Sequence, residues 1–217
     1  MYRALLFDLD GTLINSLPYH YLAFKDLLDE HGIHINDRHL RTLMGKSTED
    51  IFAELKKKYG FAEKTADLLE ERRYHYFKFV GQRNLLFPGV MSTLKLLHKT
   101  HKLALVTGSS RVIMSHSTNK AFSALFDVII TINDVKKGKP EPESFLKAAK
   151  QLKVLPKQCL VIGDSLYDAL GARHAGMDCI GVSTGYTSAT SLKKHTKKVV
   201  RDITALKVLA RPNVFRG

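Results

Sequence analysis

The fold of this chain is decided by Leu5-Leu6-Phe7-Asp8-Leu9-Asp10-Gly11-Thr12-Leu13, an apolar run that ends in two carboxylates and a glycine. Such a run is typical of a buried parallel strand, and Gly11 ends it. Residues two apart in an extended chain point the same way, so Asp8 and Asp10 begin on one face. Gly11 permits backbone angles closed to other residues, which lets the chain turn and direct both carboxylates into one cleft.

Two neighbouring carboxylates repel each other unless a cation or a shared proton relieves them. Asp8 and Asp10 therefore indicate either a divalent metal site or an acid/base couple. The alternative is that Asp10-Gly11 is only a turn after an ordinary strand. Segments far downstream decide between these interpretations.

Three later segments repeat the pattern of an apolar strand followed by small, polar or charged residues. These are Leu103–Val106 before Thr107-Gly108-Ser109-Ser110, Val128–Ile130 before the segment Gly138-Lys139-Pro140, and Cys159–Ile162 before Gly163-Asp164-Ser165, with Asp168 one helical turn further on. Ligands of open α/β sheets collect outside the carboxyl ends of the strands, so we expect the four strand ends to form one site. That site would hold carboxylates, hydroxyls and one ammonium group.

The four segments resemble the motifs of the haloacid dehalogenase superfamily, in the family's order and across nearly the whole chain. Asp8 to Leu13 resembles motif one, Thr107 motif two, Lys139 motif three, and Asp164 with Asp168 motif four. Within the superfamily the chain is similar to the phosphoglycolate phosphatase and β-phosphoglucomutase branch. The resemblance implies an α/β fold with a three-layer, Rossmann-like parallel sheet core and an inserted all-helical cap domain.

Helical periodicity places the inserted cap at residues 15–86 and the core at residues 1–14 plus 87–217. Helices are predicted from Pro18 to about Gly32, from Asp37 to Met44 with an end at Gly45, from Ser47 to about Tyr59, and from Glu63 to Phe79. The aromatic residues Tyr74, Tyr76, Phe77 and Phe79 are expected to fill the core of the cap. Pro88-Gly89 marks the return to the sheet, whose last predicted strand is Cys179–Val182.

The chemistry of phosphoryl transfer suggests a role for each motif residue, because it relies mostly on positioning and charge neutralisation. Asp8 would be the nucleophile that forms an aspartyl-phosphate, and Asp10 the acid/base that serves both half-reactions. Lys139 would neutralise Asp8 and the phosphate. Thr107 and the backbone amides of Gly108 and Ser109 would hold the phosphoryl oxygens.

Mg²⁺ is the expected cofactor, since it takes hard oxygen ligands. Asp8, the Asp10 backbone carbonyl and Asp164 would hold it. Asp168 would contact either the metal or only a metal-bound water, and the second role is favoured.

Substrate selection is expected from the cap, where His20 and Lys46 are the candidate binding residues and Arg72 or Arg73 are further candidates. Dehalogenases of the superfamily lack the second aspartate of motif one, so the presence of Asp10 disfavours carbon–halogen cleavage. Phosphonate-cleaving relatives carry a cap lysine, and the mutase branch a cap arginine, where this chain has Thr48. The resemblance therefore implies a phosphatase acting on a small phosphorylated metabolite, such as a sugar phosphate or a phosphoglycolate-like ester, with a sugar-phosphate mutase as the alternative.

Composition fits this interpretation but adds one open question. The chain has 217 residues and two cysteines, and 34 Lys and Arg against 21 Asp and Glu give a net charge of +13. No apolar stretch approaches the roughly 20 residues of a membrane span, and no signal-peptide run precedes the first strand, so we expect a soluble, cytoplasmic protein. We expect a monomer without a specific nucleic-acid partner. The positive charge leaves a polyanion-binding protein as a hypothesis of another class.

Overall fold

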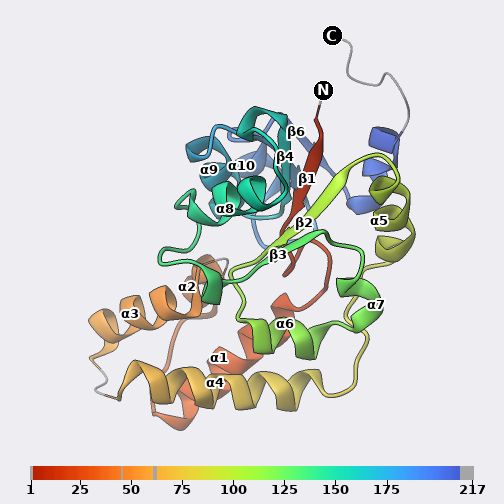
Figure 1. Ribbon diagram of the computed structural model, residues 1–217. Coiled ribbons are helices and arrows are strands. Elements are labelled where there is room, and N and C mark those ends of the chain that lie inside the picture. The colour runs from red at the N-terminus through yellow and green to blue at the C-terminus, as the bar shows by residue number, and fades with distance from the viewer. Residues whose placement is uncertain (1, 45, 61–62, 211–217) are drawn as a thin grey trace.

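A six-stranded parallel sheet forms the centre of the computed structural model, which describes residues 2–44, 46–60 and 63–210 (Figure 1). Its strands are β1 (Ala4–Phe7), β2 (Lys102–Val106), β3 (Val128–Ile130), β4 (Cys159–Gly163), β5 (Asp178–Val182) and β6 (Lys198–Val200). They lie in the order β3-β2-β1-β4-β5-β6, and every neighbouring pair is parallel. The predicted α/β class and parallel sheet are confirmed. The sixth strand was not predicted, because it follows a lysine-rich segment that reads as a charged surface.

Helices cover both faces of the sheet and give it three layers. One face packs against α8 (Glu143–Gln151) and α9 (Leu166–His174), and the other against α5 (Val90–His98) and the 3-10 helix η3 (Ile203–Ala210). Residues alternate between these layers along a strand, so Leu5 joins one apolar cluster and Leu6 the other. Shorter helices complete the core: α6 (Arg111–Ser117), α7 (Lys120–Ser123) and α10 (Ala189–Lys193).

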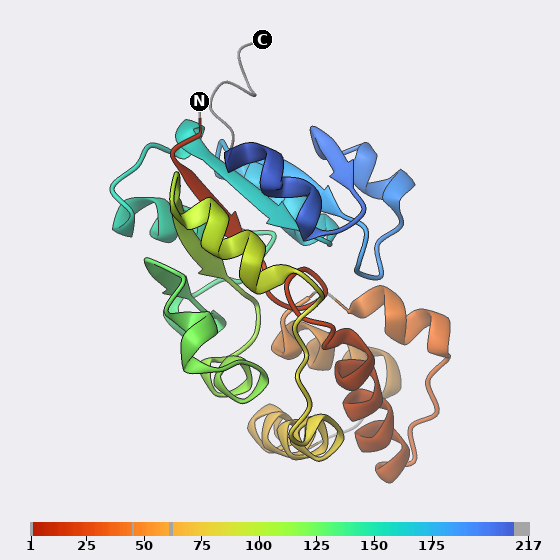
Figure 2. The ribbon, with the colours of Figure 1, turned by 90° about the vertical axis from the view of Figure 1, so that its right-hand side faces the viewer.

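Four helices between β1 and α5 lie at the carboxyl edge of the sheet, and we call them the cap helices (Figure 2). They are α1 (Leu17–Glu30), α2 (Asp37–Leu43), α3 (Thr48–Tyr59) and α4 (Thr65–Val80). They enclose an apolar cluster of their own that includes Phe24, Leu40, Phe52 and Leu68. The predicted helices therefore all form, although α4 begins two residues after Glu63. The predicted helix end at Gly45 lies outside the described residues.

The sequence predicted that the aromatic residues of α4 fill the core of the cap, but none of them belongs to the apolar cluster of the cap helices. Tyr74 is 66% exposed, and Tyr76, Phe77 and Phe79 pack with the apolar cluster of the sheet and not with that of the cap helices, so the prediction is wrong for all four residues. Tyr76 is fully buried, but its hydroxyl lies 2.7 Å from Ser117 Oγ in α6, where it connects the cap helices to the core. No helix among the described residues is long and apolar enough to cross a membrane.

Candidate active site

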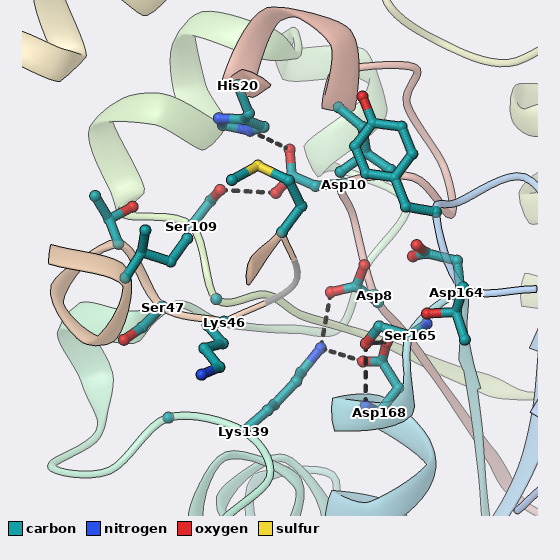
Figure 3. A pocket seen from close by; sticks show the side chains of 18 of the residues that line it. Asp8, Asp10, His20, Lys46, Ser47, Ser109, Lys139, Asp164, Ser165 and Asp168 are labelled. Atoms are coloured by element: carbon teal, nitrogen blue, oxygen red, sulfur yellow. Dashed lines mark hydrogen bonds and ion pairs between the residues drawn. The ribbon is translucent and has the colours of Figure 1, made fainter. Parts of the chain in front are cut away.

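The carboxyl ends of the central strands meet the cap helices in one pocket (Figure 3). From the core, Asp8 and Asp10 follow β1, Gly108 and Ser109 follow β2, and Asp164 follows β4. The pocket is completed from the core by Gly138, Lys139, Ser165, Asp168, Tyr186 and Thr187, and from the cap side by Leu17, His20, Phe24, Met44, Lys46, Ser47, Thr48, Ile51 and Arg72. The predicted convergence of the strand ends therefore occurs.

Lys139 is buried and uses its ammonium group to join three parts of the site. Its Nζ donates to Asp8 Oδ1 at 2.7 Å, to Asp168 Oδ1 at 2.6 Å and to the Val106 carbonyl at 2.7 Å. Burial alone would lower the pKa of Lys139, but the two carboxylates outweigh this effect and raise the pKa above its usual value. The ammonium group is therefore charged throughout the physiological range.

Asp8, Asp164 and Asp168 form a buried carboxylate group in which one oxygen of each residue lies within 4.8 Å of the others. Burial, opposed by Lys139 and assisted by the charges of Asp168 and Asp10, raises the pKa of Asp8 to about 7. Burial and the charge of Asp8 likewise raise the pKa of Asp164. If all three carboxylates were ionised, the group with the Lys139 ammonium would carry a net charge of −2, and the raised pKa values reflect this repulsion. This hard-oxygen donor set fits a divalent cation such as Mg²⁺, which would relieve the repulsion.

Asp168 has both carboxylate oxygens engaged by neighbouring side chains and backbone. Oδ1 accepts the Lys139 bond, while Oδ2 accepts from Ser165 Oγ at 2.5 Å and from the Ser165 amide at 3.2 Å. The bond from the Ser165 amide, together with the Asp168 amide donating to Ser165 Oγ at 3.2 Å, forms the capping box at the start of α9. The geometry suits a residue that holds Lys139 in place beside Asp8. Asp8 and Asp164 are left as the side chains better placed to ligate a metal.

Asp10 points away from the carboxylate group and toward the cap helices (Figure 3). Its Oδ1 accepts from Ser16 Oγ at 2.6 Å and lies 3.0 Å from His20 Nε2. Its Oδ2 accepts from Ser109 Oγ at 2.7 Å and from Thr107 Oγ1 at 3.4 Å. Burial would raise the pKa of Asp10, but the interactions with His20, Ser16 and Ser109 outweigh it and lower the pKa. The backbone carbonyl is the part of Asp10 left for a metal.

His20 is held by a buried arginine behind it. Arg72 of α4 donates through Nη2 to His20 Nδ1, so the proton on the ring is at Nε2, where it is donated to Asp10. Burial and the charge of Arg72 lower the pKa of His20, which favours this neutral tautomer. The ring stacks on Tyr76 at 4.3 Å between centroids. A chain of donors thus runs from Arg72 through His20 to Asp10.

Other predicted residues lie in or beside the pocket with contacts that the sequence did not indicate. Thr107 is buried, and its hydroxyl accepts from the Ser109 amide at 2.9 Å. The Ser109 amide, predicted to hold a phosphoryl oxygen, is therefore already bonded. Gly108 lines the pocket as expected, and Lys46 lines it while paired with Glu54 of α3.

Sequence reasoning missed three contributors to this site. Thr12 Oγ1 donates to Asp164 Oδ1 at 2.7 Å, and Ser16 binds Asp10 as described. The third is the loop after β5, of which Tyr186 and Thr187 line the pocket. That loop carries the same signal as the other strand ends, because small polar residues follow an apolar strand at Ser183. It could have been found by extending the pattern to β5.

Comparison with known proteins decides the family. The family model described as haloacid dehalogenase-like hydrolase matches residues 5–182. The chain belongs to the haloacid dehalogenase-like hydrolases. The predicted superfamily and enzyme character are thereby confirmed.

Relatives of this hydrolase bear the names of different activities. A validoxylamine A 7'-phosphate phosphatase of Streptomyces hygroscopicus subsp. limoneus is 33% identical over 192 residues, which cover 85% of this chain and 87% of that protein. A phosphoglycolate phosphatase of Yersinia pestis is 30% identical over 190 residues, which cover 85% of this chain and 82% of that protein. The crystal structure of a β-phosphoglucomutase from Clostridium difficile superimposes with a TM-score of 0.81 at 29% identity, covering 95% and 93% of the two chains. Family membership therefore leaves the substrate open.

Proposed function

We propose that this hydrolase is a Mg²⁺-dependent phosphatase that hydrolyses a small phosphate monoester, such as a sugar phosphate, through an aspartyl-phosphate on Asp8. The observation that carries the proposal is that Asp8 and Asp10, although only two residues apart, have side chains in different surroundings. Asp8 lies against Lys139 and the carboxylate group, whereas Asp10 is bound by donors from the cap helices and the β2 end. Phosphatases among the relatives support the same reaction class.

In the first half-reaction, an Asp8 oxygen attacks phosphorus and the bond from phosphorus to the ester oxygen breaks. The leaving oxygen takes a proton from Asp10, which becomes ionised. Lys139 holds Asp8 in position and offsets part of the charge on the phosphoryl group. An entering phosphate ester brings negative charge next to Asp10. This charge raises the pKa of Asp10 from its low value in the free enzyme and so favours the protonated form.

In the second half-reaction, a water molecule attacks the phosphorus of the aspartyl-phosphate. Asp10 takes the proton of this water, the bond between phosphorus and Asp8 breaks, and inorganic phosphate leaves. The donors around Asp10 suit this step because they stabilise its ionised form. A neutral His20 donates a hydrogen bond without competing for the proton.

Mg²⁺ would be held by Asp8, Asp164 and the Asp10 backbone carbonyl, and when bound it would neutralise charge that develops on the phosphoryl oxygens. Asp168 would act through Lys139 and through water near the metal. Thr12 and Ser165 would keep Asp164 and Asp168 in their orientations.

The leaving group would lie against the cap helices. The cap side of the pocket combines apolar side chains such as Phe24, Met44 and Ile51 with the polar groups of Lys46 and Thr48. The similarity to a β-phosphoglucomutase favours a mutase as second candidate. Thr48 offers no cation for a second phosphate, and this favours transfer to water.

The proposal is tested by phosphate release from sugar phosphates, phosphoglycolate, nucleotides and an aryl phosphate, with Mg²⁺ or with a chelator. We expect release that requires Mg²⁺ and that falls at least about 10³-fold in Asp8→Asn, since a carboxamide is a far weaker nucleophile. Asp67→Asn, an exposed carboxylate of α4, is the matched control and should retain full activity. Conversion of β-glucose 1-phosphate to glucose 6-phosphate without phosphate release would favour the mutase. Release that persists in Asp8→Asn would exclude the proposed nucleophile.

A further inference from the structure

The loop after β5 lies directly on the carboxylate group of the site. Thr184 Oγ1 donates to the Gly11 carbonyl at 2.6 Å, which fixes the loop to the turn after β1. Gly185 approaches Asp164 so closely that a Cβ built there would lie 1.7 Å from Asp164 Oδ2. The next residue, Tyr186, lines the pocket and is 36% exposed. Tyr186 therefore follows directly on a segment that is held against the turn after β1 and against Asp164.

Arg41 of α2 reaches this tyrosine from the cap side. Its guanidinium carbon lies 5.3 Å from the centroid of the Tyr186 ring and 4.4 Å from the centroid of the Tyr21 ring in α1. A cation over an aromatic face is attracted by the electron density of the ring. The guanidinium group therefore lies between one ring of the cap helices and one ring of the core.

We propose that Arg41 and Tyr186 are positioning residues that hold α2 and the start of α3 over the pocket, and that they thereby set the affinity for the leaving group of the substrate. The part of this proposal that concerns substrate affinity rests on the proposed phosphatase function. Met44, Lys46 and Thr48 follow Arg41 within seven residues and line the pocket opposite the carboxylates. Fixing Arg41 on the core loop fixes these wall residues relative to Asp8.

The position of the pair determines which kinetic constant it affects. Arg41 does not line the pocket, and Tyr186 belongs to the pocket wall and not to the hydrogen-bond network of Asp8 and Asp10. Loss of the contact should therefore weaken substrate binding and leave the chemical step almost unchanged.

The kinetic experiment compares Arg41→Gln and Tyr186→Leu with the conservative variants Arg41→Lys and Tyr186→Phe. We expect KM to rise about two- to fivefold in the first two, the fold-change that corresponds to an exposed cation–π contact, with kcat within about twofold of wild type. The conservative variants should recover most of the affinity, because they keep the cation or the ring. The double variant should lose no more than the larger single effect, since both changes remove one contact.

Arg38→Gln is the matched control, because Arg38 is an exposed arginine of the same helix three residues earlier. It should leave KM unchanged. An unchanged KM in both Arg41→Gln and Tyr186→Leu, a fall in kcat alone, or multiplication of the two effects in the double variant would overturn the proposal.

A spectroscopic experiment tests the contact without catalysis. The chain has no tryptophan, so Tyr186→Trp introduces a single fluorescent reporter that keeps an aromatic face toward Arg41. We expect acrylamide to quench its emission more strongly when Arg41→Gln is added, and not when Arg38→Gln is added. Equal quenching in all three proteins would overturn the contact itself. Absence of phosphatase activity together with the expected quenching would instead reject the proposed function while the contact stands.

Discussion

The Asp10 carboxylate accepts hydrogen bonds from four donors on different parts of the chain, and its pKa is lowered. Ser16 and His20 come from the start of the cap helices, while Thr107 and Ser109 follow β2 of the core. All four favour the ionised carboxylate by donating hydrogen bonds to it. The position of α1 relative to the sheet therefore controls the proton affinity of the candidate acid/base.

His20→Ala should slow hydrolysis in a manner that depends on the leaving group. We expect kcat to fall about 10- to 100-fold for an alkyl phosphate, because Asp10 without the His20 bond is no longer held in place to protonate the leaving oxygen. The fall should be several times smaller for an aryl phosphate, because a phenolate leaves without protonation. His20→Gln keeps a donor near Asp10 and should lose less. Equal losses with both substrates would show that His20 does not act on protonation of the leaving group by Asp10.

Gly185→Ala should weaken metal binding. The added methyl group would overlap Asp164 Oδ2, so either the carboxylate or the loop must move. We expect the Mg²⁺ concentration for half-maximal activity to rise about 10- to 100-fold, as for other changes that displace a metal ligand. Ser183→Ala, an exposed position of the same loop, should leave this concentration unchanged. An unaltered Mg²⁺ requirement in Gly185→Ala would argue against Asp164 as a metal ligand.

Helices α1 and α4 pack against each other, and the sequence predicted both of them. Apolar residues at helical spacing predicted both helices, and Phe24 and Leu68 meet in the cluster between them. The Ser47 side chain accepts from the Asp50 amide at 3.1 Å and begins α3, as its sequence pattern predicted. Tyr76 then ties α4 to the core through Ser117. The division into a core of residues 1–14 and 87–217 and a cap domain of residues 15–86 stays a prediction.

His31 makes the α1–α4 contact dependent on pH. It follows α1 directly, with Nε2 lying 3.0 Å from Glu71 and Nδ1 lying 3.2 Å from Glu63. The hydrogen bond with Glu71 and the charges of both glutamates outweigh burial and raise the pKa of His31 in the folded protein. Its contribution is therefore complete below the unfolded pKa of about 6.5, and it is lost as the pH rises through the higher folded value.

His31→Gln should accordingly lower the free energy of unfolding by up to about 1 kcal/mol at acidic pH and by almost nothing at alkaline pH. Denaturant titrations near pH 5.5 and near pH 9 measure the difference. His34→Gln is the control, because the His34 side chain is 88% exposed and should show little effect at either pH. The same loss at both pH values would mean that the His31 ring, and not its charge, stabilises the contact.

At the scale of the whole molecule, the net charge of +13 is not carried by the pocket lining, where the Lys and Arg side chains are outnumbered by the Asp side chains. Exposed lysines concentrate around α10 and β6, where Lys193, Lys194, Lys197 and Lys198 lie within six residues. Lysines on an edge strand also oppose pairing with other chains. A positive field would attract anionic esters at low ionic strength.

We therefore expect kcat/KM for a phosphate monoester to fall about two- to tenfold between low and high salt, with kcat almost constant. A substrate with a second phosphate should show the steeper dependence. The same titration with an arbitrary DNA fragment tests the polyanion-binding hypothesis, which requires tight binding at low salt that weakens steeply as salt is added. A salt-independent kcat/KM would contradict electrostatic attraction of substrate. The monomeric state and the cytoplasmic location stay predictions.

Local patterns were enough to predict the parallel sheet and the polar residues at its strand ends. An apolar run buried on two faces predicts its strand, and the carboxylates of Asp8 and Asp164 are fixed to strand ends that must share one edge. The spacing of apolar residues likewise predicted the cap helices. The short strand β6 escaped prediction because its neighbours are lysines.

Which side chains contact one another became known from the packing of the helices on the sheet. The chain of donors from Arg72 through His20 to Asp10 joins residues 52 and 10 positions apart, and the bond from Lys139 to Asp8 spans 131 positions. Such contacts depend on how helices pack on the sheet, and no local spacing encodes that packing. The same packing gives the two aspartates different surroundings, although they lie two residues apart. Asp8 lies among buried carboxylates, whereas Asp10 lies among hydroxyl and imidazole donors.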